Sequence, residues 1–182
     1  MVNVESEAPG RLESVRTLLN TRHIRNDTRS ATDDLPSLLA DRSVWKRSIP
    51  DIRFPDTDAG RSEMLHVRTA IRAAIAHDTS KLDAMLTDVR WQIGLREHGP
   101  VGAVDWSADP PSITGDALAI VTQAAAAQTW ARLRACPDCQ WVFYDTSRNG
   151  RRIWCAMTAA DGARGCGSIA KTRAYRRRAA LR

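Results

Sequence analysis

The chain has 182 residues, 43% of them hydrophobic, and a formal net charge of +6. This length accommodates one medium domain or a domain with a small module, and this hydrophobic content excludes a wholly disordered chain. No run approaches the roughly 18–20 apolar residues of a membrane span, and the first residues hold no apolar segment of a secretory signal. We therefore expect a cytoplasmic protein without a membrane partner, in a reducing compartment where cysteines serve more often as metal ligands or redox groups than in disulfides.

The positive charge is concentrated at the C-terminal end. Residues 132–182 hold 12 Lys and Arg against three acids, a net charge of +9, whereas residues 1–131 hold 15 against 18, a net charge of −3. This asymmetry indicates two units with different partners, of which the basic one suits a polyanion. An arginine-rich composition alone would not separate the arginines from the acids.

Helical periodicity marks most of the chain before residue 90. We expect helices over residues 11–21, from Leu35 behind a cap at Asp34, from a cap at Ser62, and from a cap at Thr79 or Ser80. The expected apolar stripes are Leu12, Val15, Leu18 and Leu19; then Leu65, Ile71 and Ile75; then Leu82, Met85, Leu86 and Val89. Residues 49–60, rich in Pro and Asp, are expected to form a loop.

The period changes to two at residue 89. Apolar residues at 89, 91, 93 and 95 predict a strand with one buried face, a turn follows at 98–100, and residues 101–106 supply a partner strand. A long alanine-rich helix is then predicted over about 115–134, opened by Thr114. Trp45, Trp91, Trp106 and Trp130 are interpreted as packing residues, with a stacking site for a ligand as the alternative. The predicted fold class is α+β and mainly helical.

All four cysteines fall in one pattern of C-x2-C-x15-C-x10-C. They are Cys136, Cys139, Cys155 and Cys166. Four thiolates suit a closed tetrahedral Zn²⁺ site, whose role is to fold a module too small for its own core. The alternatives are an iron–sulfur cluster, which takes the same ligands, a redox C-x-x-C, whose usual βαβ setting is missing, and four ordinary cysteines.

The segments between the cysteines predict a small finger. Cys136 and Cys139 form a knuckle, residues 140–145 alternate as a strand, and Asn149-Gly150 is a hairpin turn that returns the chain to Cys155. A basic helix is expected over about 168–181. The order of knuckle, hairpin and helix predicts a treble-clef-like zinc finger over 134–182, preceded by a mainly helical domain with a small β-hairpin over 1–133.

These motifs resemble the CGNR zinc-finger family of bacterial proteins, which is described as one of stress-induced transcription regulators. The resemblance lies in residues 130–149, 152–157, 166–167 and 170–176, and more weakly in 19–22, 33–35 and 67–74. It implies zinc as the cofactor, DNA as the partner, and transcription regulation as the function. The sequence departs from the family where Ser168-Ile169 replaces the expected Asn-Arg and where residues 159–165 look like an insertion.

We expect the basic residues of the finger to contact nucleic acid, because the planar guanidinium of Arg can donate two hydrogen bonds at once to a phosphate or a guanine. They are Arg148, Arg151, Arg152, Lys171, Arg173, Arg176, Arg177 and Arg178. The domain over 1–133 is a candidate for binding a small-molecule effector. No nucleophile motif, phosphate loop or diagnostic carboxylate pair is found, so we expect no enzyme activity. The alternative is a zinc-stabilised protein-interaction or RNA-binding module, with thiolate oxidation as a redox control.

Overall fold

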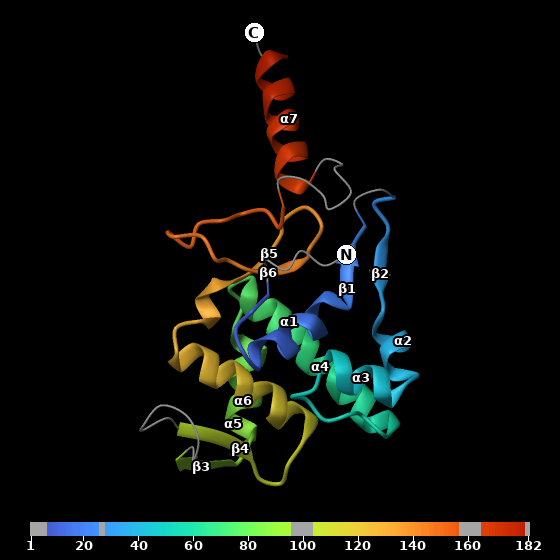
Figure 1. Ribbon diagram of the computed structural model, residues 1–182, viewed down its shortest axis with the longest axis vertical. Coiled ribbons are helices and arrows are strands. Elements are labelled where there is room, and N and C mark those ends of the chain that lie inside the picture. The colour runs from blue at the N-terminus through green and yellow to red at the C-terminus, as the bar shows by residue number, and fades with distance from the viewer. Residues whose placement is uncertain (1–6, 26–27, 96–103, 157–164, 181–182) are drawn as a thin grey trace.

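The computed structural model describes residues 7–25, 28–95, 104–156 and 165–180. Helices predominate and form a body from which the last helix projects (Figure 1). The helices are α1 (Leu12–Asn20), α2 (Leu35–Leu39), α3 (Arg42–Ser48), α4 (Asp58–Ile75), α5 (Ser80–Asp88), α6 (Ile113–Ala126), the 3₁₀ turn η2 (Trp130–Arg132) and α7 (Cys166–Ala179). Among the helices described, none is both long and apolar enough to span a bilayer.

In the described part of the chain, three antiparallel hairpins accompany the helices and confirm the α+β, mainly helical class. Their strands are β1 (Arg22–Ile24) with β2 (Ala31–Asp33), β3 (Trp91–Leu95) with β4 (Val104–Ala108), and β5 (Leu133–Ala135) with β6 (Val142–Tyr144). The register pairs Ile93 with Trp106 in the second hairpin and Arg134 with Phe143 in the third. Each hairpin therefore presents two faces, and its position on the helices decides which face is buried.

The core lies where α1, α4 and α6 pack together. The predicted stripe of α1 is confirmed, because Val15, Leu18 and Leu19 are fully buried. In α4 the buried stripe is Met64, Val67 and Ile71, with the same spacing of three and four residues. The prediction placed Leu65 on that stripe, but Leu65 is 43% exposed, so the buried face is rotated by one residue.

Two helix starts differ from the sequence prediction because of their caps. The Oγ1 atom of Thr57 accepts a hydrogen bond from the backbone N–H of Gly60, so α4 begins at Asp58 and not behind Ser62. Asp41 caps α3 by accepting from the N–H groups of Ser43 and Val44, and this helix was not predicted. Its central residue, Trp45, is 1% exposed and donates its indole N–H to the Ile52 carbonyl, as expected for a core tryptophan.

The helix predicted over 115–134 is shorter than expected. Ser112 caps its start by accepting from Gly115 N–H, and α6 ends at Ala126. Gln128 takes a left-handed conformation (φ 58°), which stops the helix, and residues 133–135 become a strand. The alanine-rich composition favoured helix locally, but pairing with β6 determines the structure of this segment.

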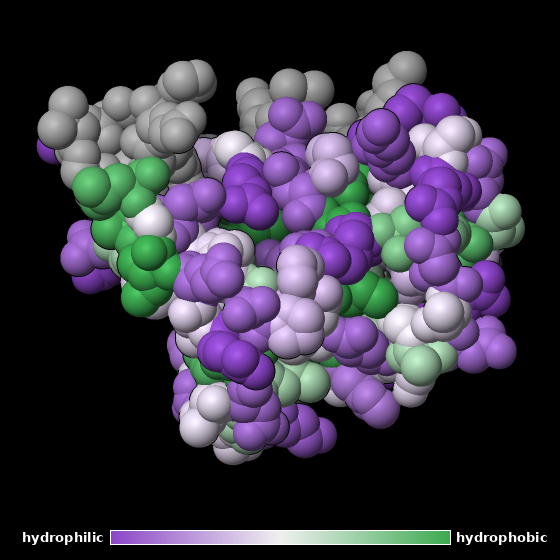
Figure 2. Space-filling model, turned by 90° about the horizontal axis from the view of Figure 1, so that it is seen from below, coloured by the Kyte–Doolittle hydropathy of each residue, from purple (hydrophilic) through white to green (hydrophobic). Residues whose placement is uncertain are grey.

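The β3–β4 hairpin differs from its prediction in burial. Its apolar face was expected to be buried, but Ile93 is 62% and Leu95 77% exposed, while Trp91 is half-buried. The outer end of the hairpin extends past the helices, so only its inner end reaches the core. Apolar side chains are visible together on this side of the molecule (Figure 2). The turn predicted at 98–100 lies outside the described residues.

The β5–β6 hairpin is anchored to the helical body. Leu133 and Val142 belong to the main core, and the side-chain amide of Asn20 pairs with both backbone groups of Val142, at 2.8 Å and 2.7 Å. Arg72 of α4 donates to the Gln140 carbonyl at 2.9 Å, and Ile24 N–H to the Cys139 carbonyl at 2.8 Å. These contacts place the first two cysteines on a rigid base. The division of the chain into two domains at residue 133 stays a prediction.

Candidate metal centre

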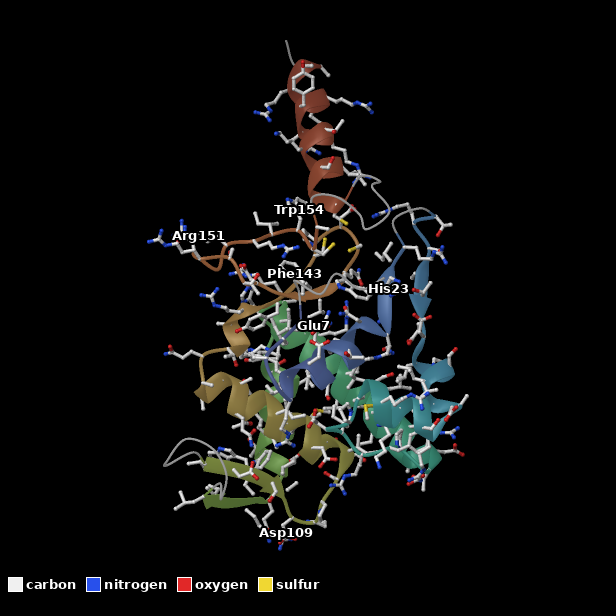
Figure 3. All side chains as sticks on the ribbon, in the orientation of Figure 1. Glu7, His23, Asp109, Phe143, Arg151 and Trp154 are labelled. Atoms are coloured by element: carbon white, nitrogen blue, oxygen red, sulfur yellow. The ribbon has the colours of Figure 1, made fainter. Side chains whose placement is uncertain are left out.

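Four sulfur atoms gather between the β5–β6 hairpin and the start of α7. The Sγ atoms of Cys136, Cys139, Cys155 and Cys166 all lie within 4.8 Å of one another. None of the four forms a disulfide, and all but Cys155 are buried. In Figure 3 the sulfurs lie at the base of α7, near the labelled Phe143 and Trp154. The structure thus brings together the four cysteines that the sequence pattern selected.

The first pair of cysteines is held by a tight turn between β5 and β6. Cys136 N–H donates to the Trp141 carbonyl, and Gln140 N–H donates back to the Cys136 carbonyl, both at 2.9 Å. Gln140 adopts a left-handed conformation (φ 60°), which folds the chain back after Cys139. Both thiols therefore point to the same side of the knuckle.

The third cysteine follows a loop organised by Asp145. This carboxylate is fully buried, and it accepts hydrogen bonds from Ser147 N–H at 2.9 Å, from the Ser147 hydroxyl at 2.5 Å and from Arg152 N–H at 2.8 Å. Burial raises the pKa of Asp145, but these hydrogen bonds and the charge of Arg134 outweigh it and hold the pKa below its usual value. The loop therefore has a buried anionic anchor that returns the chain to the metal centre.

Arg152 braces the same loop from within the finger. Its guanidinium lies 5.0 Å from the centroid of the Phe143 ring, Nε donates to the Trp154 carbonyl at 2.9 Å, and Nη2 donates to the Cys155 carbonyl. Sequence reasoning counted Arg152 among the nucleic-acid contacts and did not single out Asp145 or Phe143. Asp145 and Arg152 bind backbone groups of the folded loop, and Phe143 contacts the Arg152 side chain, so their roles depend on the fold and no sequence motif marks them.

One detail of the predicted finger is wrong. Residues 140–145 were expected to pair with the later segment that ends at Cys155. Instead, β6 pairs with β5, the strand that precedes the knuckle in the chain. The segment from 151 to 155 has no strand assignment. The turn at Asn149-Gly150 is present, with Gly150 left-handed (φ 58°), inside the Asp145 loop and not in a hairpin.

The fourth cysteine is the first residue of α7. Gly167 N–H donates to the Ala156 carbonyl at 3.0 Å, which ties the helix start to the segment after Cys155. The helix N-terminus carries a partial positive charge, and this favours a thiolate at Cys166. The helix begins two residues before the predicted 168, so the ligand lies inside its first turn.

The chemistry of the four sulfurs fits a divalent metal ion. The Sγ atoms of Cys139 and Cys155 lie 3.5 Å apart, close to the separation of about 3.8 Å that tetrahedral Zn–S bonds of about 2.3 Å impose. Hydrogen bonds from the thiols of Cys139 and Cys155 lower the pKa of Cys136, and the Cys136 and Cys139 groups raise the pKa of Cys155. Thiols this close oppose each other's ionisation, and a bound cation removes that conflict.

Residues 132–179 match the family model of the CGNR zinc finger. The last third of this chain carries a CGNR zinc finger. Its four cysteines are positioned to bind one Zn²⁺. No curated protein matches the chain.

The CGNR finger departs from the residues of its name at the start of α7. Ser168 and Ile169, which replace the expected Asn and Arg, are both half-buried in the first turn of α7. The Ser168 carbonyl accepts a hydrogen bond from the Thr172 hydroxyl at 3.0 Å. Of the apparent insertion over 159–165, only Gly165 belongs to the described residues.

The predicted nucleic-acid contacts occupy two parts of the CGNR finger. Arg148 and Arg151 are exposed on the Asp145 loop, where the structure places Arg151 at its edge (Figure 3). Five exposed residues lie on α7: Lys171, Arg173, Arg176, Arg177 and Arg178. Arg173 forms an ion pair of 3.2 Å with Asp138 in the knuckle, and Asp138 is also paired with Arg29 at 3.1 Å.

Proposed function

We propose that the CGNR finger binds DNA through α7 and that the protein acts as a transcription regulator. The observation that carries this proposal is the projection of α7 from the body with five exposed basic side chains (Figure 1). Residues 166–180 contain no Asp or Glu. A projecting, uniformly basic helix suits the phosphates and grooves of a nucleic acid.

The charges of α7 are mostly available to a partner. Among the described residues, Arg173 is the one basic residue of α7 with an ion pair, and its partner is Asp138. Arg148 and Arg151 add positive charge on the neighbouring loop. Arg152 is left out of the proposed contact surface because its donors are used within the finger. We call the remaining seven residues the basic surface: Arg148, Arg151, Lys171, Arg173, Arg176, Arg177 and Arg178.

The proposed role of the metal is structural, and we propose no enzyme activity. Four thiolates fill the tetrahedral coordination of Zn²⁺ and leave no position for a water or substrate. The ion joins the knuckle, the Asp145 loop and the first turn of α7, three segments with few apolar contacts of their own. Zinc therefore fixes the direction in which α7 leaves the body.

Charge reversal on α7 tests this proposal. The double variant Arg176→Glu/Arg177→Glu should weaken binding to duplex DNA of any sequence at least tenfold and reduce the slope of log affinity against log salt by about 2, because two phosphate contacts are lost. Fluorescence anisotropy over a series of salt concentrations measures both quantities.

The matched control is Lys46→Glu/Arg47→Glu, which changes the net charge equally on the exposed side of α3. This control should retain most of the affinity. Equal losses in both double variants would mean that overall charge and not α7 governs binding, and the absence of any duplex binding by the unaltered protein would refute the proposed function.

A further inference from the structure

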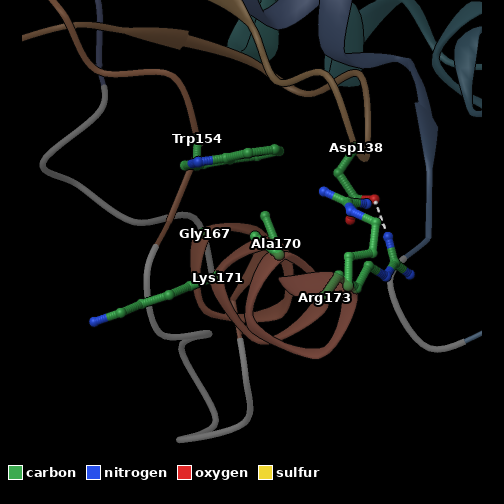
Figure 4. A pocket seen from close by; sticks show the side chains of 8 residues that line it. Asp138, Trp154, Gly167, Ala170, Lys171 and Arg173 are labelled. Atoms are coloured by element: carbon green, nitrogen blue, oxygen red, sulfur yellow. Dashed lines mark hydrogen bonds and ion pairs between the residues drawn. The ribbon is translucent and has the colours of Figure 1, made fainter. Parts of the chain in front are cut away.

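A groove lies beside the metal centre, between Trp154 and one face of α7. It encloses about 480 Å³ and is bordered by Trp154, Asp138 and the helix residues Gly167, Ala170 and Ala174 (Figure 4). We call it the Trp154 groove. Its volume falls in the range of small-ligand sites, and neither zinc binding nor the packing of the finger requires it.

The helix side of the groove is made of small residues. Gly167, Ala170 and Ala174 are three and four positions apart, so they follow one another along a single face of α7. None of them has a side chain that reaches across to Trp154. The gap between the helix and the indole is therefore open to a flat group.

The opposite side of the groove is a positioned aromatic ring. Trp154 is half-buried and packs against the cluster of Cys136, Cys139, Phe143 and Cys166. Its carbonyl accepts from Arg152, whose guanidinium lies over Phe143. The hydrogen bond fixes the Trp154 backbone and the packing restrains its indole, so the ring can stack on a planar ligand at little entropic cost.

The charge of the groove is positive. Among the described residues, Lys171, Arg173 and Arg177 border it and Asp138 is the one acid, so this part of the lining carries a net charge of +2. The Asp138 carboxylate is already paired with Arg29 and Arg173. Figure 4 shows Lys171 on one side of the groove and Asp138 with Arg173 on the other. Lys171 and Arg177 are left for an anionic ligand.

We propose that the Trp154 groove binds an unpaired nucleotide of a DNA strand, with the base stacked on Trp154 and a flanking phosphate on Lys171 or Arg177. An aromatic platform inside a basic groove is how proteins hold single strands, since every base has a face to stack. A base within a duplex has both faces covered by its neighbours, so the groove selects an unpaired one. The inference rests on the proposed DNA binding and adds a preference for strands with exposed bases.

Two variants test the groove from its two sides. Trp154→Ala removes the stacking surface, and Ala170→Leu fills the gap from the helix without removing any contact. Each should weaken binding of the full-length zinc protein to a short oligothymidine by about 5-fold to 150-fold, as expected when one base loses its aromatic partner. The affinity of both variants for a DNA duplex of equal length should match that of the unaltered protein. Ala84→Leu, on the exposed face of α5, is the matched control for added volume.

Zinc content is measured in parallel, because Trp154 precedes a ligand. An abasic strand of the same length separates stacking from phosphate binding, and the unaltered protein should bind it as weakly as Trp154→Ala binds oligothymidine. Equal affinity of the unaltered protein for the abasic strand and oligothymidine, or undiminished oligothymidine binding by Ala170→Leu, would overturn the proposal. Duplex binding without single-strand binding would overturn the groove assignment alone, whereas binding of neither would overturn the proposed function as well.

Discussion

At the scale of single residues, the knuckle shows how one backbone angle positions a metal ligand. Gln140 is left-handed, and both its backbone N–H and its carbonyl are used, by Cys136 and Arg72. Its side chain is exposed. A left-handed conformation costs an L-residue with a Cβ atom about 1–2 kcal/mol, whereas glycine adopts it freely. Glutamine at position 140 therefore makes the fold less stable than glycine would, and its side chain does not serve the metal centre.

Gln140→Gly should accordingly raise the free energy of unfolding by about 0.5–1 kcal/mol, less than the full conformational cost because glycine also gains freedom in the unfolded chain. Denaturant titration of the zinc-loaded protein measures the change. The control is Gln92→Gly, at an exposed position of β3 with an ordinary strand conformation. This substitution should lower the free energy of unfolding. Equal effects of the two substitutions would show that the knuckle carries no strain at Gln140.

The pair of Asp33 and Arg68 governs a pH-dependent part of the stability. Two hydrogen bonds, of 2.7 Å and 2.6 Å, join the guanidinium to the carboxylate, and Arg68 is 4% exposed. The hydrogen bond from Arg68 is the largest cause that lowers the pKa of Asp33 below its usual value. A depressed pKa means that the stabilisation is complete above the unfolded-state pKa of about 3.9 and is lost as pH falls through the folded-state pKa.

Asp33→Asn should therefore destabilise the protein by about 1 kcal/mol at neutral pH, a low value because solvent screens the partly exposed carboxylate. The difference from the unaltered protein should shrink as pH falls below the unfolded-state pKa of about 3.9 and be lost once pH passes below the lowered folded-state pKa of Asp33, which unfolding curves at several pH values measure. Loss of zinc in acid affects both proteins alike, so the difference between them remains the readout. The neighbouring Asp34→Asn, at an exposed position, is the control, and a pH-independent difference for Asp33→Asn would contradict the assignment.

At the scale of elements, α1 and β6 are joined by a polar contact inside the core. The side-chain amide of Asn20 pairs with the N–H and carbonyl of Val142 as a neighbouring strand would, and Asn20 is only 7% exposed. β6 leads directly out of the knuckle. This amide therefore acts with the contacts of Arg72 and Ile24 to set the orientation of the metal centre on the helical body.

Asn20→Ala should cost about 1–3 kcal/mol in the free energy of unfolding, because it leaves the buried Val142 N–H without its partner. Thermal unfolding with zinc bound measures the loss. The same substitution at Asn149, exposed on the Asp145 loop, should change stability by less than about 0.5 kcal/mol. If both variants melted alike, the Asn20–Val142 contact would not hold the finger to the body.

The metal ligands were predictable because their spacing is local and their chemistry is distinctive. Cys136, Cys139, Cys155 and Cys166 needed no tertiary information to be grouped. The supporting residues were not predictable in this way, since Asn20 and Asp145 act on backbone groups whose positions only the fold determines. Residues 133–135 were misassigned because Leu133 continues the apolar pattern of α6, while its strand partner lies across the knuckle.

The whole molecule places a rigid base under a projecting basic helix. Leu133 and Val142 join the core of the helical body, whereas Cys136, Cys139, Phe143 and Cys166 form a second, smaller cluster beneath α7. The second cluster has too few apolar side chains to hold its three segments together without a metal ion. Both the direction of α7 and the Trp154 groove therefore depend on the same four Zn–S bonds.

X-ray absorption at the zinc edge of the purified full-length protein tests the four-cysteine zinc site most directly. A closed four-cysteine site should give one zinc per chain and a single shell of four sulfur atoms at about 2.3 Å, the distance of tetrahedral zinc thiolates. A shell with nitrogen or oxygen atoms, or fewer than four sulfurs, would contradict the assignment of Cys136, Cys139, Cys155 and Cys166 as the complete ligand set.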